Sequence, residues 1–201
     1  MTLSQKKRAQ IINAAISEFK ASGYAATSMD RVAQTAQVSK RTVYNHFPSK
    51  QALFIGIVSM MLDLISAATK MQYSSERSLA EQLTQLANKE LQLFADPEFI
   101  DLARLVIAEA IHMPEQMIET MQHMATLENS INYWFECAIN DGRIHSDNPG
   151  LASSQFLSML KGRCFWPQII NRMPMPSAAE QTELVESCIA MFLSHYQPKP
   201  E

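Results

Sequence analysis

Glycine is scarce in this sequence, and cysteine is scarcer still. There are 5 glycines and 9 prolines among 201 residues, too few for the many tight turns of an all-β sandwich or barrel. The same shortage leaves no glycine-rich phosphate loop, no G-x-G-x-x-G fingerprint and no G-x-S-x-G nucleophile elbow. We therefore expect a binding protein and not an enzyme.

The three cysteines, Cys137, Cys164 and Cys188, are an odd number without C-x-x-C spacing. They cannot build a disulfide framework or a four-cysteine zinc site, so we expect a reducing, cytoplasmic environment. No two histidines are spaced i, i+4, and we expect neither a metal nor a cofactor. On apolar helical faces these thiols would be small buried hydrophobes, and a redox sensor is the alternative.

We also expect no membrane-spanning helix, since no stretch approaches the ~20 consecutive apolar residues of a membrane span. The basic start of the chain runs into polar residues rather than into the apolar core of a signal peptide. We expect no membrane partner. What the sequence does have is 47% hydrophobic and 18% charged residues, a globular composition.

Basic residues gather at the start of the chain. Residues 1–52 hold eight Lys and Arg against two acidic residues, whereas the rest of the chain holds nine against eighteen. A basic head on an acidic body points to a polyanionic partner for the head, because phosphate backbones attract Lys and Arg. A solvated basic face, or contact with another acidic partner, would show the same composition.

Apolar side chains recur at the helical period along the whole chain, which predicts an all-α fold. The head is predicted to hold three helices: from a cap at Ser4 to Gly23, from Thr27 or Ser28 to Ala36, and from a cap at Ser39 to Phe47. The tight turn between the last two is typical of a helix-turn-helix unit. We therefore expect a head over residues 1–48 and a larger helical body over residues 49–201.

The segment Val38–Lys50 carries most of the functional information. On a helix, Val43 and Phe47 lie one turn apart and face the core. The side chains left outside are Lys40, Arg41, Thr42, Tyr44, Asn45 and His46. Such a helix fits the major groove of DNA, where Arg or Lys reads guanine, Asn reads adenine and hydroxyls contact phosphates. A polar surface helix without a DNA partner is the alternative.

Two stretches, Thr27–Ala33 and Ser39–Lys50, resemble the head of the tetracycline-repressor (TetR) family of bacterial transcription regulators. The resemblance implies a homodimer that binds a palindromic DNA operator, usually to repress, and that leaves DNA when a small molecule enters the larger domain. The family pattern commonly has glycine in the turn where this chain has Gln37. A positive φ there would add strain of roughly 1 kcal/mol.

The resemblance also implies roles for single residues. Lys40 and Arg41 resemble base readers, while Thr42, Tyr44, His46 and Lys50 resemble phosphate contacts. The full expected DNA-binding set is Thr27, Ser39, Lys40, Arg41, Thr42, Tyr44, Asn45, His46 and Lys50.

The body is expected to bind an effector and to dimerise. Its methionine and aromatic side chains could line an adaptable apolar pocket, although helical spacing does not separate a pocket from a core. The expected effector-binding residues are Leu105, His112, Met113, Met117, Met121 and Trp134. The expected dimer interface, made by the last two helices of each subunit, is Phe156, Met159, Leu160, Val185, Cys188, Ile189 and Phe192, with an intramolecular core as the alternative.

Together these observations predict a cytoplasmic, ligand-responsive DNA-binding regulator, associated with the nucleoid when bound to DNA. Its expected partners are double-stranded operator DNA, a small, largely apolar effector and a second copy of the chain.

Overall fold

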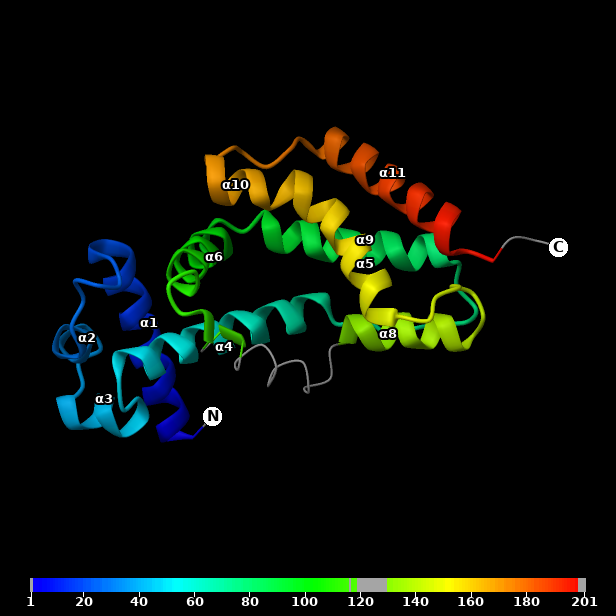
Figure 1. Cartoon of the computed structure of the whole chain (residues 1–201). Helices are drawn as coiled ribbons and strands as arrows, with labels where there is room; N and C mark the ends of the chain where they lie inside the picture. The colour runs from blue at the N-terminus through cyan, green and yellow to red at the C-terminus, as the bar shows by residue number, and fades with distance from the viewer. Residues whose placement is uncertain (1, 116, 119–129, 199–201) are drawn as a thin grey trace. The chain divides into compact units, whose positions relative to one another are not determined.

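The computed structural model describes residues 2–115, 117–118 and 130–198 (Figure 1). Within these ranges every regular element is an α-helix, which confirms the all-α prediction. The helices are α1 (Leu3–Ser22), α2 (Met29–Thr35), α3 (Lys40–His46), α4 (Lys50–Thr69), α5 (Leu79–Phe94), α6 (Pro97–Ala110), α8 (Ser130–Asn140), α9 (Pro149–Cys164), α10 (Trp166–Asn171) and α11 (Ala178–Tyr196).

The chain divides into two compact units, Met1–Asp63 with Asp101–Met124, and Leu64–Ile100 with Ala125–Glu201. The boundary predicted between residues 48 and 49 lies inside the first unit. Each unit is therefore assembled from two separate stretches of chain, and the two-domain division at residue 48 stays a prediction.

The first helix begins earlier than the sequence predicts. Thr2, rather than Ser4, caps α1: its hydroxyl accepts a hydrogen bond from Gln5 N, and the Gln5 side chain accepts one from Thr2 N. This capping box satisfies amides that a helix start leaves unpaired. At the other end Gly23, with φ of 80°, ends α1 as predicted.

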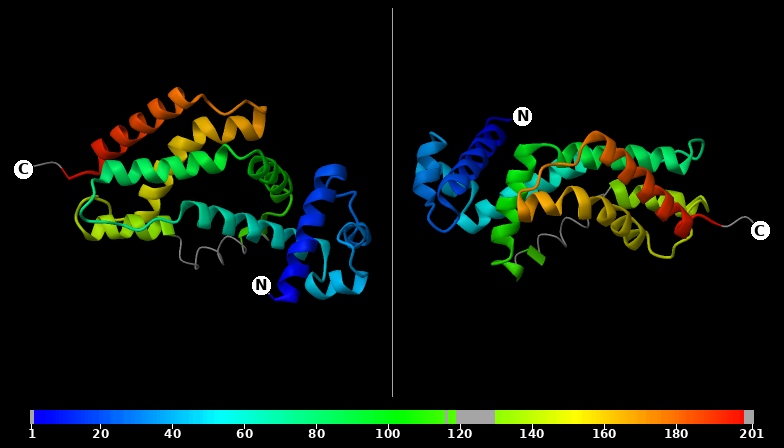
Figure 2. Two further views of the ribbon diagram at one scale, coloured as in Figure 1. Left: turned by 180° about the vertical axis from the view of Figure 1, so that it is seen from behind. Right: turned by 90° about the horizontal axis from the view of Figure 1, so that it is seen from above.

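The two short helices of the head both start at serine caps. The Ser28 hydroxyl accepts a hydrogen bond from Arg31 N, and the Ser39 hydroxyl accepts one from Thr42 N. Ser28, and not Thr27, is thus the cap of α2. α2 packs against both α1 and α3, and Figure 2 shows the three helices grouped together. The apolar residues buried in this head include Ile11, Ile12, Phe19, Val32 and Val43.

The end of α3 packs against α4 at a glycine. A Cβ at Gly56 would lie 2.7 Å from Phe47 Cε1, so the close approach of this ring requires glycine. The Arg8 guanidinium of α1 lies 5.1 Å from the centre of the same ring. The Ser49 hydroxyl accepts a hydrogen bond from Ala52 N and caps α4. Phe47 thus joins three helices of the first unit.

α4 corrects the expectation that no stretch of the sequence could span a membrane. By length and composition alone, this helix of 20 residues could cross a bilayer. In the structure its side chains at Leu53, Phe54, Ile57 and Val58 are fully buried by protein. The first half of α4 is therefore a core helix, whose apolar composition packing explains.

The second unit is built from α5, α8, α9 and α11. α9 packs on the other three helices, and it lies beside α11 in Figures 1 and 2. Aromatic rings fill the interior between them. Phe135 of α8, Phe156 of α9 and Phe192 of α11 contact one another with ring centroids 5.4 to 6.5 Å apart.

Gln82, fully buried on α5, links the segment before α5 to α8. Its Nε2 donates hydrogen bonds to the carbonyl oxygens of Ser74 and Arg77, and its Oε1 accepts one from Trp134 Nε1 at 3.2 Å. A buried amide is stable only where its donors and acceptors are paired. The buried amide of Gln82 thus has hydrogen-bond partners for both its nitrogen and its oxygen.

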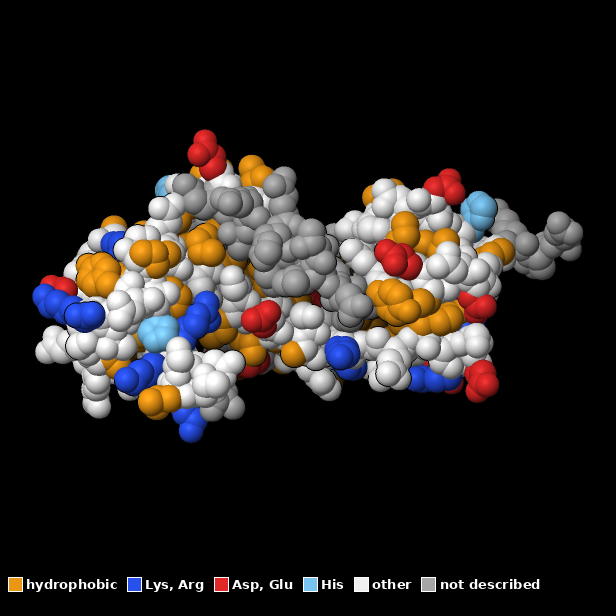
Figure 3. Space-filling view, turned by 90° about the horizontal axis from the view of Figure 1, so that it is seen from below, with side chains coloured by type: hydrophobic (Ala, Val, Ile, Leu, Met, Phe, Trp, Pro, Cys, Tyr) orange, Lys and Arg blue, Asp and Glu red, His pale blue; other side chains and the backbone are white. Residues whose placement is uncertain are grey.

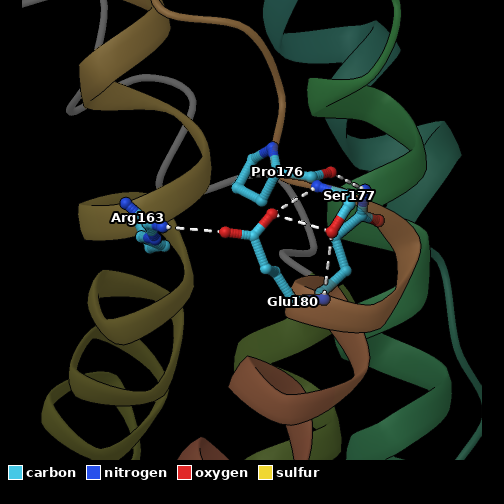
Figure 4. Close-up of polar contacts among 5 residues, drawn as sticks. Arg163, Pro176, Ser177 and Glu180 are labelled. Carbon is cyan, nitrogen blue, oxygen red and sulfur yellow. Dashed lines mark hydrogen bonds and ion pairs between the residues drawn. The ribbon is translucent and has the colours of Figure 1, made fainter.

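The start of α11 is tied to α9 (Figure 4). The Ser177 hydroxyl accepts a hydrogen bond from Glu180 N, and Glu180 Oε2 accepts one from Ser177 N at 2.8 Å. Glu180 Oε1 lies 3.3 Å from the Arg163 guanidinium of α9. The hydrogen bonds from Ser177 lower the pKa of the Glu180 carboxyl, and Arg163 lowers it further.

Local features mark the helix ends in the body. Gly142, with φ of 68°, follows α8, and the Asn148 side chain caps α9 by accepting a hydrogen bond from Leu151 N. The short helix α10 was not predicted. It begins after Phe165, with Pro167 in its first turn, and ends at Arg172 in the left-handed region.

Candidate nucleic-acid interface

The turn between α2 and α3 has left-handed backbone at Gln37, whose φ is 52°. Backbone hydrogen bonds from Gln37 N to Gln34 O and from Val38 N to Ala33 O close this turn. The position at which the family pattern has glycine therefore does require a positive φ. A side chain in this conformation adds strain of about 1 kcal/mol.

α3 presents a polar outer face. Val43 is fully buried on the inner side, as predicted. Of the predicted contact residues, Ser39, Lys40, Arg41, Tyr44 and Asn45 are exposed, while Thr42 and His46 are half-buried. Figure 3 shows Lys and Arg side chains gathered over the end of the first unit that α1–α3 form. This face can offer cations, hydroxyls and an amide to a polyanion.

One ion pair joins α2 to α1, and a second joins Lys40 of α3 to α2. Arg31 Nε lies 2.6 Å from Glu18 Oε2, and the Thr35 hydroxyl donates a hydrogen bond to Glu18 Oε1. Lys40 Nζ pairs with Asp30 Oδ2 between α2 and α3. More than half of each side chain in this second pair is exposed, so the pair contributes little stability and can exchange for a DNA contact.

Two residues of the expected DNA-binding set have partners inside their own unit. Thr27 is 2% exposed, and its hydroxyl donates a hydrogen bond to Gly23 O. Lys50 Nζ donates to the carbonyl oxygens of Tyr24, Ala25 and Thr27 at 2.8, 3.1 and 3.0 Å. An ammonium has three donors, and these contacts use all of them. The phosphate roles of Thr27 and Lys50 stay predictions.

The residues expected to bind an effector fall in both units. In the first unit Leu105 and Met113 are half-buried, Met117 is buried and His112 is exposed. In the second unit Trp134 is 1% exposed and donates its indole hydrogen bond inside the core. Met121 lies outside the described residues. The effector role of this set stays a prediction.

The residues expected to form a dimer interface are mostly covered by their own chain. Buried positions are Phe156, Leu160, Val185, Cys188, Ile189 and Phe192, and Met159 is half-buried. They lie where α9 and α11 pack together, which corresponds to the intramolecular alternative. The role of this set in a dimer interface stays a prediction.

The three thiols differ in their surroundings. Cys164 and Cys188 are buried, and burial raises the pKa of both, which disfavours the reactive thiolate. Cys137 is half-buried and borders a hollow that Tyr73 and Asp141 also line. Within the described ranges, no three His, Cys, Asp or Glu side chains come together to hold a metal ion.

Glu90 on α5 is a polar core residue that sequence reasoning missed. Its side chain is buried, and burial raises the pKa of the carboxyl, while the charge of Lys161 on α9 acts in the opposite direction. The available signal was a single acidic residue between Leu86 and Phe94 on the apolar face of an amphipathic helix.

Two family models match the chain. Residues 11–57 match the bacterial regulatory proteins of the tetR family. Residues 81–198, more than half of the chain, match the C-terminal domain of the AefR-like transcriptional repressor. The matches cover the head and most of the body.

Solved structures and a curated relative agree with these matches. A TetR family transcriptional regulator from Pseudomonas syringae pv. tomato str. DC3000 is 38% identical with a TM-score of 0.79, over 98% of this chain and 100% of that one. The flavonoid-responsive regulator FrrA is 26% identical with a TM-score of 0.80, over the same shares. The HTH-type transcriptional regulator YhgD of Bacillus subtilis (strain 168) is 32% identical over 71% of each chain. Such proteins are DNA-binding regulators rather than enzymes. The chain therefore belongs to the TetR family of bacterial transcriptional regulators.

Proposed function

We propose that this protein is a homodimeric repressor that binds a palindromic operator and leaves it when a small, largely apolar effector binds its body. The observation that carries the DNA-binding part is α3, a capped helix that buries Val43 and exposes Arg41, Tyr44 and Asn45. A helix of this kind can read base edges in the major groove. Family membership supports the same function.

Lys40 and Arg41 serve as base readers in this proposal, and Thr42, Tyr44 and His46 contact phosphates. Lys40 exchanges Asp30 for DNA, since their ion pair is exposed. Lys50 acts by positioning: its bonds to three carbonyl oxygens fix the segment before α2 against the start of α4.

Dimerisation follows from the small size of one recognition helix, because useful specificity needs two half-sites roughly 34–36 Å apart. The exposed sides of α9 and α11 are available for a second copy. On α9, Ser154, Ser158 and Gly162 lie exposed at i, i+4 and i+8, and on α11 Ala190 and Met191 are exposed. Small side chains let two helices approach closely, which supports a four-helix interface on this face.

The comparisons favour an aromatic effector, because a solved structure of the same fold that matches 98% of this chain is named for its response to flavonoids. The protein would act in the cytoplasm, where the operator is. The effector shifts the equilibrium between the DNA-binding and the DNA-free state. The size of this shift is limited by how much more tightly the effector binds the DNA-free state.

The test is footprinting of promoter fragments next to the gene with the purified protein. We expect one protected, two-fold symmetric site. The logarithm of the binding constant should fall linearly with the logarithm of the salt concentration, with a slope of about −0.9 for each phosphate that the protein neutralises. Arg41→Met should relax base preference at one position of each half-site. Failure to protect any promoter fragment, or salt-independent binding, would reject the proposal in favour of another acidic partner.

A further inference from the structure

Glu90 lies in the middle of the buried face of α5. At about 100° per residue, Leu83, Leu86 and Phe94 flank it on the same side of the helix. All three are at most 2% exposed, and Glu90 itself is 2% exposed. The Glu90 side chain therefore lies on the apolar side of α5, inside the second unit.

This carboxyl has no partner in the part of the chain that the structure describes. No hydrogen bond or ion pair joins it to any side chain or backbone group there, and Lys161 acts on it as a charge without forming an ion pair. Gln82, two turns earlier on the same helix, is equally buried and has partners for its donors and its acceptor. Glu90 thus differs from Gln82, whose polar atoms all form hydrogen bonds.

An unpartnered buried carboxyl destabilises the ligand-free protein, because desolvation of the group is not offset by a hydrogen bond. Polar groups left unsatisfied in this way are concentrated at functional sites. Because Glu90 lies in the proposed effector domain, a bound ligand could supply the hydrogen bond that its carboxyl group lacks.

We infer that the Glu90 carboxyl binds a hydroxyl group of the effector, which makes the effector an apolar molecule with a phenol or alcohol directed at α5. This inference rests on the proposed function. A carboxylate effector would place like charge against Glu90, and a cationic effector would place like charge near Lys161. A neutral hydroxyl avoids both repulsions, and its hydrogen bond to a carboxylate is strong.

The experiment compares a trihydroxyflavone with its fully methylated counterpart, which lacks every hydroxyl donor. Binding to the full-length protein is measured by isothermal titration calorimetry. We expect the native protein to prefer the hydroxylated compound by about tenfold or more, the factor that one charge-assisted hydrogen bond supplies. Glu90→Leu should reduce this preference to about one, since its side chain accepts no hydrogen bond.

Two further variants separate recognition from folding. Glu90→Gln keeps the size and an acceptor oxygen, so it should fold as the native protein does and retain part of the preference. Glu183→Leu removes an exposed acidic residue of α11 and should retain the full preference.

A preference that survives in Glu90→Leu overturns the inference, as does a native protein that binds neither flavone or both equally. Operator release is measured separately. If the flavone binds through Glu90 but leaves the operator complex intact, the proposed function fails while the role of Glu90 stands.

Discussion

The Lys50 ammonium lies 4.4 Å from the centre of the Tyr24 ring and donates a 2.8 Å hydrogen bond to the Tyr24 carbonyl oxygen. The ring also packs edge-on against Phe19 and Phe54. Lys50 and Tyr24 thus connect the end of α1, the segment before α2 and the first turn of α4. Because α3 lies between these segments in the chain, the contact helps to set the position of the recognition helix.

Lys50→Met should lower the free energy of unfolding by about 1–3 kcal/mol, since the carbonyl oxygens of Tyr24, Ala25 and Thr27 would lose the hydrogen bonds that Lys50 donates. Urea unfolding followed by circular dichroism measures this. Lys40→Met is the matched control: its ion pair is exposed, so the change should stay within about 1 kcal/mol. A Lys50 variant of native stability that still loses DNA affinity would assign Lys50 to phosphate contact instead.

Gln37→Gly should stabilise the head by about 0.5–1 kcal/mol, because glycine adopts a φ of 52° without the steric cost of a Cβ. The gain is reduced by the greater freedom of glycine in the unfolded chain. Gln34→Gly, at an exposed position inside α2, should instead destabilise by about 1 kcal/mol. A loss of stability from both changes, in thermal unfolding, would contradict the assignment of strain to Gln37.

Gly162→Arg should convert the proposed homodimer to monomers. A Cβ at Gly162 would meet no atom within 4 Å, so the subunit itself has room for the new side chain. Arginine also favours a helix more than glycine does. Light scattering after size-exclusion chromatography measures the mass, and circular dichroism checks the fold. If the Gly162→Arg variant stays dimeric, the dimer interface does not include this face of α9.

Glu90→Leu should stabilise the ligand-free protein, and the gain should grow with pH. Burial raises the pKa of the folded carboxyl above its ordinary value of 4.5. Between the two values the folded state binds a proton that the unfolded state does not, so the native protein loses stability as pH rises through this window. Unfolding of both proteins at about pH 5 and about pH 8 measures the difference. An equal gain at both values would show that Glu90 does not titrate there.

Features that depend on a few neighbouring residues could be predicted from the sequence. The cap at Ser39 and the helix end at Gly23 rest on local hydrogen bonds and backbone conformation, and the structure confirms them. The polar outer face of α3 follows from helical periodicity in the same way. The start of α1 was missed because Thr2 and Ser4 are both good caps.

Features that depend on which helix packs against which could not be predicted. An apolar stripe looks alike whether it meets a helix of its own chain or of a partner, and Phe156 and Phe192 turned out to pack against each other. The contacts of Lys50 likewise arise from tertiary packing, because its spacing in sequence is that of an ordinary helical residue.

Cys137 is the one cysteine that meets solvent, since Cys164 and Cys188 are closed off in the core. A maleimide dye or a nitroxide spin label applied to the folded native protein would therefore attach to α8 at a single place. No cysteine needs to be removed or added to follow this helix spectroscopically while effector and DNA are titrated in.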